Sequence, residues 1–248
     1  MSAPGAAIVN PHAAESAQRF HRATYLIGQA TDRVPEAASA PPGPIALPCV
    51  EPAAGPALEQ VIARRRTRRD FDARKTLSVE GLARLLVLSA GRTALAEPGS
   101  WAPPSGHRAV PSAGATYPVS VHLIARRVAG LAPGIYEYAA LDHTLLPGPQ
   151  GTDDDLLERS TLDQPWMRGA AAVFVLVGTL ERIAPRYASR GYRYMLFEAG
   201  HVAQNLYLLG TAHGLCVQAT GGFIDDAITR MMGLDVGRDP LYLLAVGP

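Results

Sequence analysis

The sequence predicts an α+β sandwich, and three observations lead to that expectation. Helix-like and strand-like segments alternate along residues 57–248. Hydrophobic residues make up 48% of the 248-residue chain, enough for one substantial core with an appended N-terminal segment. No Gly-x-Gly-x-x-Gly motif follows a strand, which argues against the parallel doubly wound sheet of dinucleotide-binding domains.

The first 56 residues differ in composition from the domain at residues 57–248 and are expected to be a Pro/Ala-rich N-terminal arm. Residues 14–25 can form one short helix. Pro35–Pro56 contains seven prolines, which argue against any regular helix or strand. We expect this stretch to cross a protein surface in extended form, with the surface of a partner subunit as one candidate.

Residues 57–248 are expected to form a succession of helices and strands. Ser78 is the expected N-cap of a helix over residues 79–90, and Gly91 is its expected end. Apolar periodicity and turn residues indicate the remaining elements. The other expected helices cover residues 57–66, 192–213 and 225–232, and the expected strands cover residues 119–126, 134–138, 170–177, 215–219 and 241–246.

Charge and cysteine content limit the class of protein. The net charge of +1 provides no overall field that would recruit nucleic acid or an anionic membrane. Apolar runs reach about half of the roughly 20 residues that span a bilayer, and no secretory signal is recognised. The two cysteines, Cys49 and Cys216, are too few for a disulfide framework. We therefore expect a cytoplasmic protein with reduced thiols and no nucleic-acid or membrane partner.

Three separate segments are candidates for ligand binding. The first is the basic cluster Arg64–Arg69, whose arginines and one hydroxyl can bind a phosphate group, although a solvated basic helix end is an equal alternative. The second is the Ser-Ala-Gly turn between Pro111 and Pro118, and the third is the glycine pair after Thr220. Both turns can bring bare backbone close to a ligand, although by composition alone an ordinary loop is the simpler reading of the second.

In their residues and in their order along the chain, the three segments resemble those of the nitroreductase family, and the resemblance covers about residues 57–247. The resemblance implies a homodimer in which a central mixed, mainly antiparallel sheet is flanked by helices, with FMN sites at the subunit interface. It assigns FMN phosphate, ribityl and pyrimidine contacts to Arg65, Arg66, Thr67 and Arg69. It assigns the loop that packs on the flavin of the other subunit to Pro111, Ser112, Ala113 and Gly114, and the segment near flavin N5 to Thr220, Gly221 and Gly222.

A fourth segment, Tyr192–Leu206, resembles the azoline dehydrogenase branch (SagB/ThcOx type) of that family. In this branch a Lys-Tyr pair just upstream is linked to proton abstraction from the azoline ring, and the matching catalytic pair here is Arg186-Tyr187. Tyr187 can act as base or proton relay, whereas Arg186 cannot act as a base because a guanidinium stays protonated. Glu198 and His201 lie on one helix face, where a satisfied buried pair is favoured over a metal site.

The resemblance implies a two-electron dehydrogenation in which a substrate hydride passes to FMN and the electrons then pass to O₂ or another acceptor. The implied substrate is a thiazoline, an oxazoline or a related ring in a peptide or carrier-bound intermediate. Two alternatives remain: an NAD(P)H-dependent nitroreductase or quinone reductase, and a non-catalytic scaffold subunit of a biosynthetic complex. Family members also place a basic residue after the last strand, and Arg238 is the candidate to replace it.

Overall fold

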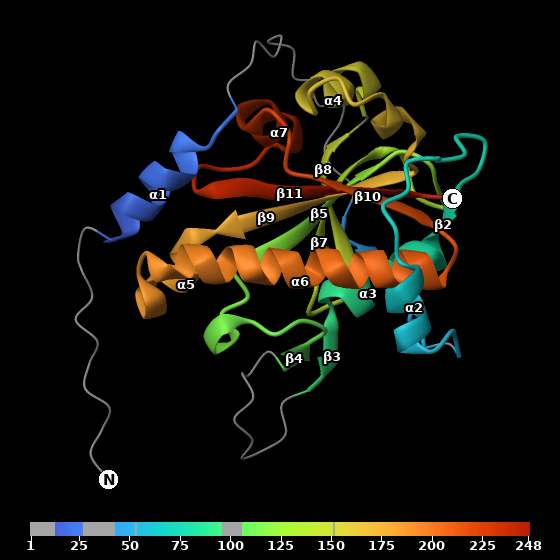
Figure 1. Cartoon of the computed structure of the whole chain (residues 1–248), viewed down its shortest axis with the longest axis horizontal. Helices are drawn as coiled ribbons and strands as arrows, with labels where there is room; N and C mark the ends of the chain where they lie inside the picture. The colour runs from blue at the N-terminus through green and yellow to red at the C-terminus, as the bar shows by residue number, and fades with distance from the viewer. Residues whose placement is uncertain (1–12, 27–42, 53, 96–105, 151) are drawn as a thin grey trace.

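The computed structural model describes residues 13–26, 43–52, 54–95, 106–150 and 152–248, which form three layers: helices, a sheet, and helices (Figure 1). Over these residues the main sheet has seven strands, and every neighbouring pair is antiparallel. In spatial order the strands are β1 (Ile45–Ala46), β8 (Thr144–Gln150), β7 (Gly134–Ala139), β5 (Val119–Ala125), β9 (Ala172–Thr179), β11 (Arg238–Gly247) and β10 (Cys216–Thr220).

Two short pairs of strands lie outside this sheet. One pair is parallel and the other antiparallel, so among the named strands of the described residues the parallel component of the predicted mixed topology is confined to a small accessory pair. The parallel pair is β2 (Leu77–Ser78) with β6 (Val128–Ala129), and the antiparallel pair is β3 (Arg92–Ala94) with β4 (His107–Arg108). The predicted α+β class, with a mainly antiparallel sheet between helices, is confirmed.

Helices cover both faces of the sheet (Figure 1). On one face lie α2 (Leu58–Arg64), α3 (Val79–Ala90), α5 (Leu180–Tyr187) and the long α6 (Arg190–Ala212). On the other lie α4 (Asp154–Ser160), the 3-10 helix η2 (Pro165–Gly169) and α7 (Asp225–Met232), while α1 (Ala13–Ala23) packs beside the first turns of α6. Within the described ranges no helix combines the length and apolar composition needed to cross a membrane.

The central strand β9 shows why this apolar run becomes a buried strand. Phe174 and Leu176 face the core beneath α3 and α6, whereas Val173, Val175 and Val177 face the core beneath α4 and α7. Alternate side chains of a strand point to opposite faces, and both faces are covered here. A strand with two covered faces is apolar throughout instead of alternating, as the sequence of β9 shows.

The predicted ends of α3 are confirmed. The Ser78 hydroxyl accepts a hydrogen bond from the Gly81 N–H at 3.0 Å, as expected of an N-cap. The helix ends at Ala90, and Gly91 follows as its C-cap. Leu82, Leu85, Leu86 and Ser89, which share the predicted apolar face, are all buried.

The structure corrects the expectation for the proline-rich stretch. Ile45–Ala46 forms β1, which pairs with β8 of the same chain, and Leu47 N–H extends the contact by donating to the His143 carbonyl at 3.1 Å. Prolines at the ends of a two-residue edge strand remove no hydrogen bond from the ladder, so a short strand is tolerated. Residues 35–42 and 53 lie outside the described residues.

Several elements were not predicted, and β8 and α4 show the reasons. The sequence of β8 contains Pro147 and Pro149, which argue for a loop, yet tertiary pairing with β7 and β1 holds the segment in the sheet. The short helix α4 begins at the N-cap Asp153, whose carboxylate accepts a hydrogen bond from Leu156 N–H at 2.9 Å. A seven-residue helix gives too weak a periodic signal to be recognised in sequence.

Candidate functional site

Two of the three candidate segments lie at the same edge of the main sheet, beside β10. Arg65 follows α2, and its guanidinium carbon is 5.3 Å from the centre of the Tyr207 ring on α6. The Tyr207 hydroxyl lies 3.3 Å from Thr67 Oγ1 and accepts a hydrogen bond from Ala219 N–H at 2.9 Å. Tyr207 therefore joins the basic segment to the strand that leads into Thr220.

The glycine turn after β10 is fixed by polar contacts. Thr220 Oγ1 accepts a hydrogen bond from Gly222 N–H at 3.0 Å. The Gln164 side-chain amide donates to Thr220 Oγ1 at 3.1 Å and to the Gly222 carbonyl at 3.2 Å. No heavy atom lies within 4 Å of the position that a Cβ would take at Gly221. The turn therefore presents backbone to open space, as a close approach to a ligand requires.

Arg69 lies at the same edge. Its guanidinium carbon is 5.1 Å from the centre of the Trp166 ring, and Trp166 Nε1 donates to Gln218 Oε1 at 3.0 Å. We call the set Arg65, Thr67, Arg69 and Thr220–Gly222 the β10 patch. Its guanidinium groups, hydroxyls and bare backbone suit a phosphate-bearing ligand with a polar chain.

Arg66 lies apart from this patch. Its guanidinium donates to the carbonyls of Ala63, at 3.0 Å, and Arg65, at 2.8 Å, at the end of α2. Basic groups there satisfy the last carbonyls of a helix and complement its dipole. For Arg66 the structure thus supports the helix-end alternative, and of the four residues assigned in this segment it brings Arg65, Thr67 and Arg69 together.

The loop before β5 and the pair Arg186-Tyr187 meet at one glycine. Gly114, in the 3-10 turn η1 (Ala113–Ala115), has φ of 58° and ψ of 22°. A Cβ at this position would lie 2.5 Å from Arg186 Nη1 and 2.7 Å from the Tyr187 hydroxyl. Arg186 Nη1 also donates to the Gly114 carbonyl at 3.1 Å. We call Pro111–Gly114 with Arg186 and Tyr187 the Gly114 site.

The buried carboxyl group of Glu198 on α6 holds the loop before β5 through hydrogen bonds. Val119 N–H donates to Glu198 Oε1 at 3.3 Å, and the Ser112 side chain also hydrogen-bonds to this carboxyl group. Burial raises the pKa of Glu198 from about 4.5 to about 7, although these two hydrogen bonds and the charge of Arg108 act in the opposite direction. Ser112 Oγ in turn accepts from Tyr117 N–H at 2.9 Å. Glu198 is therefore part of the frame of the loop.

The β10 patch and the Gly114 site, the two half-sites of one chain, lie far apart. Tyr207 of α6 contacts the β10 patch, whereas Tyr194 of α6 packs edge-on against Tyr187 with ring centres 5.0 Å apart. Thirteen residues of helix separate them, which at 1.5 Å per residue is about 20 Å. Figure 1 shows the same arrangement, with α2 beside one end of α6 and α5 beside the other.

Two sequence interpretations are wrong in the structure. Glu198 is buried but His201 is exposed, so they are not a buried pair. Arg238 does not lie near the β10 patch. Its guanidinium forms an ion pair with Glu137 at 3.0 Å and lies 2.9 Å from His122 Nε2, and neither of these residues belongs to the patch. Over the part of the chain that the structure describes, no cluster of three or more His, Cys, Asp or Glu side chains could hold a metal ion.

Three residues of the site were not found in the sequence: Gln164, Trp166 and Tyr207. Each reaches the β10 patch from an element distant along the chain, so no local motif contains it. The signal that was available is weak. Trp166 is one of two tryptophans, and it follows a polar turn before an apolar strand.

Comparison with known proteins identifies the class. The chain belongs to the nitroreductase family of oxidoreductases, whose family model matches residues 62–248. It is 33% identical over 190 residues to MJ1384 of Methanocaldococcus jannaschii, a protein named as a nitroreductase, which covers 77% of this chain and 90% of that protein. It is 30% identical over 172 residues to the microcin B17-processing protein McbC of Escherichia coli, covering 67% of this chain but only 60% of McbC.

Solved structures share the fold. A chain of the E. coli microcin synthetase McbBCD complex with truncated pro-MccB17 bound superposes with a TM-score of 0.69 at 23% identity, covering 97% of this chain and 94% of that chain. A nitroreductase structure from Exiguobacterium sibiricum in complex with FMN superposes with a TM-score of 0.54 at 16% identity, covering 79% and 89% of the two chains. At these identities the likeness establishes the fold alone.

The raised pKa of Glu198 predicts a pH-dependent stability. Because the folded state binds this proton more tightly than the unfolded chain, the stabilisation is fully present below the ordinary pKa of about 4.5 and is lost as the pH rises through about 7. We expect the unfolding free energy of the wild type, relative to Glu198→Gln, to fall by on the order of 3 kcal/mol between pH 4.5 and pH 8.

Urea unfolding of both proteins across that range measures this difference. The neutral amide of Glu198→Gln cannot ionise, and its oxygen can still accept the hydrogen bond from Val119 N–H. Buried His122, whose pKa is lowered to about 4 mainly by burial, titrates in both proteins, so its effect cancels. Parallel pH profiles for the two proteins would contradict this prediction, because they would show that the pKa of Glu198 is the same in the folded and unfolded states.

Proposed function

We propose that this chain is an FMN-dependent dehydrogenase that oxidises an azoline ring, a thiazoline or oxazoline, in a peptide or carrier-bound substrate. The observation that carries the proposal is the convergence of the Tyr187 hydroxyl and the Arg186 guanidinium on Gly114. The similarity to the microcin B17-processing protein supports a peptide substrate. The FMN complex of a fold neighbour supports the cofactor.

The residues of the β10 patch fit FMN by their chemistry. Arg65, Arg69 and the Thr67 hydroxyl would hold the phosphate and ribityl chain, and the open Thr220–Gly222 turn would lie against the ring system. When bound, FMN supplies a two-electron acceptor for a substrate hydride. The role of the protein is to place the ring carbon that gives up the hydride and to remove the proton from the neighbouring ring carbon.

Proton removal falls to Tyr187. Its hydroxyl lies at the left-handed turn of Gly114, where the absence of a side chain lets this hydroxyl and the Arg186 guanidinium come close to the backbone of the loop. Arg186 holds the loop through the Gly114 carbonyl, and its guanidinium carbon is 5.6 Å from the centre of the Tyr187 ring. A fixed positive charge thus stands beside the oxygen that receives the proton. Arg186 itself only positions the loop.

We further propose that the working unit is a homodimer in which the Gly114 site of one subunit completes the β10 patch of the other. The distance of about 20 Å between the two half-sites of one chain is too long for one flavin site within a subunit. The outer face of α6 carries Leu196, 40% exposed, and Phe197, 59% exposed, which suits helix packing against a partner. A larger biosynthetic complex is a further candidate, since one chain of the microcin synthetase McbBCD complex shares this fold.

The proposal is tested by purifying the protein and measuring FMN released on denaturation. A thiazoline-containing peptide added without oxygen should bleach the flavin absorbance, and added O₂ should restore it while the azole product accumulates. A colourless protein that does not bind added FMN would contradict the whole proposal and leave the scaffold role.

Free thiols at Cys49 and Cys216 support a cytoplasmic location.

The similarity to MJ1384 favours a second candidate, an NAD(P)H-dependent nitroreductase or quinone reductase. The two candidates share the β10 patch but differ in the direction of electron flow. Rapid bleaching by NADH or NADPH, with no bleaching by the azoline peptide, would establish this second candidate in place of the first.

A further inference from the structure

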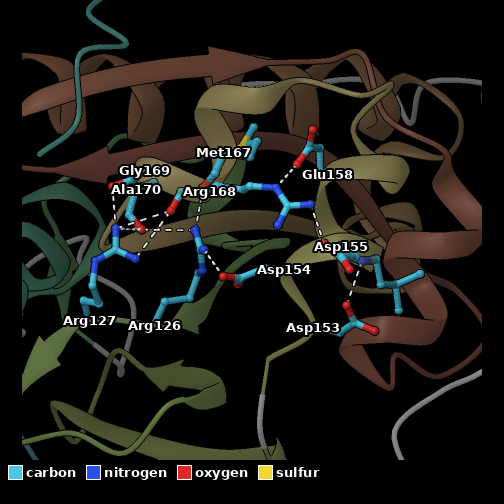
Figure 2. Close-up of polar contacts among 11 residues, drawn as sticks. Arg126, Arg127, Asp153, Asp154, Asp155, Glu158, Met167, Arg168, Gly169 and Ala170 are labelled. Atoms are coloured by element: carbon cyan, nitrogen blue, oxygen red, sulfur yellow. Dashed lines mark hydrogen bonds and ion pairs between the residues drawn. The ribbon is translucent and has the colours of Figure 1, made fainter. Parts of the chain in front are cut away.

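The loop between α4 and η2 reaches the β10 patch and is anchored by two arginines, the buried Arg126 and the partly exposed Arg127. We call residues 154–169 the α4–η2 hairpin. Arg126, only 7% exposed, donates to the carbonyls of Met167 and Ala170 and pairs with Asp154 (Figure 2). Arg127 donates to the carbonyls of Gly169 and Ala170. Two guanidinium groups thus bind carbonyls at and just after the end of η2.

A third arginine ties the two arms of the hairpin together. Arg168 of η2 forms ion pairs with Asp155 and Glu158 of α4 (Figure 2). These residues are partly exposed, so the pairs add modest energy, but they fix the relative position of the arms. The tip between the arms is therefore held at a defined place.

The tip of the hairpin contacts both segments of the β10 patch. Gln164 donates to Thr220 and to Gly222, while Trp166 donates to Gln218 and lies under Arg69. The contact between Trp166 and Arg69 is a cation–π interaction, which fixes a long and otherwise exposed side chain. Through this tip the basic segment and the glycine turn are coupled to one rigid support.

The amide of Gln164 has one group that remains unpaired. The Gly222 carbonyl can only accept, so the Gln164 Nε2 group must face it and the oxygen must point away. Among the described residues, Gln164 Oε1 is buried and has no hydrogen-bond partner. A buried acceptor without a donor is costly, and an N–H group of a bound ligand that reached this oxygen would remove that cost.

We propose that Gln164 and Trp166 are positioning residues of the cofactor site: Gln164 sets the Thr220–Gly222 turn and accepts a ligand N–H, and Trp166 sets Arg69. This inference rests on the proposed FMN site. It does not depend on which substrate is oxidised, because the residues act on the cofactor and its phosphate-binding arginine.

The test uses the full-length protein after removal of FMN, and measures the FMN dissociation constant and the midpoint potential of the bound flavin. Gln164→Leu should weaken FMN binding about tenfold, as for the loss of one or two hydrogen bonds. Gln164→Glu should lower the midpoint potential, because a negative charge beside the ring system disfavours the reduced, anionic flavin. Trp166→Phe keeps a ring beneath Arg69 and should weaken binding less than Trp166→Ala does.

Arg159→Ala is the matched control, because Arg159 is an exposed residue of the same hairpin. It should keep the FMN affinity and midpoint potential of the wild type. Thermal unfolding of each apoprotein identifies any variant that fails to fold. If Gln164→Leu does not fold, Gln164→Glu, whose side chain is similar in shape to that of the wild type, still provides the midpoint potential. Wild-type affinity and potential in both Gln164 variants would overturn this inference while leaving the proposed function intact. A wild type that binds no FMN would instead overturn the proposed function.

Discussion

Replacing Tyr187 by Phe should lower kcat for azoline oxidation by about 10²- to 10⁴-fold, the range found when a positioned acid–base group is removed. The substitution removes only the hydroxyl that lies at Gly114, and the ring can keep its edge-on contact with Tyr194. FMN binding should be unchanged, because the phosphate and ribityl contacts are assigned to Arg65, Thr67 and Arg69, none of which the substitution alters. Stopped-flow bleaching of the flavin by substrate measures the affected step directly.

Tyr194→Phe is the matched control for this prediction. It also removes one phenolic hydroxyl from the same aromatic pair, but from the residue that does not reach Gly114. It should retain the wild-type rate. Arg186→Lys should raise KM more than it lowers kcat, because a lysine can still donate to the Gly114 carbonyl with a less fixed geometry. Equal rates for Tyr187→Phe and Tyr194→Phe would rule out Tyr187 as the base.

Mixed dimers should recover activity that each parent variant lacks. Arg65→Ala/Arg69→Ala disables the β10 patch, and Tyr187→Phe disables the Gly114 site, so each homodimer has two defective sites. In a heterodimer purified through two different tags, one site combines the intact patch of one subunit with the intact Gly114 site of the other. It should therefore show about half of the wild-type activity per dimer, because one of its two symmetry-related sites is whole.

The reciprocal heterodimer gives the opposite expectation. When all three substitutions lie in one subunit and the partner is wild type, each shared site contains one defective half, and activity should be close to zero. If instead each site belonged to a single chain, the first heterodimer would be inactive and the second would keep half of the activity. The comparison thus decides between shared and separate sites whatever the absolute rate.

Local features of the fold followed from local chemistry. Ser78 and Gly91 set the ends of α3, and the apolar run of β9 identified a strand covered on both faces. Strand β8 could not be predicted in the same way, because its prolines indicate a loop. It becomes a strand through pairing with β1 on one side and β7 on the other. A strand that depends on non-local pairing carries little signal of its own.

For the candidate site, too, features made of residues adjacent in sequence were predicted, and features that depend on distant neighbours were not. The Arg65–Arg69 segment, the Gly114 turn and the Thr220–Gly222 turn were each found because their residues are adjacent in sequence and have chemistry of their own. The placement of Arg66 at a helix end, of Arg238 in an ion pair with Glu137, and of His201 on an exposed face was decided by neighbours that the sequence does not bring together.

The α+β class, the nitroreductase resemblance and its three separated candidate segments thus followed from residues that are close together in the sequence. Only the tertiary structure decided that Arg65, Thr67 and Arg69 meet the glycine turn at the β10 edge, that Arg186 and Tyr187 meet at Gly114, and that α6 holds these two sites about 20 Å apart. The reason is physical. Side-chain type and spacing define what a short segment can bind, whereas the distance between segments depends on sheet order and helix length, which arise from packing of the whole chain.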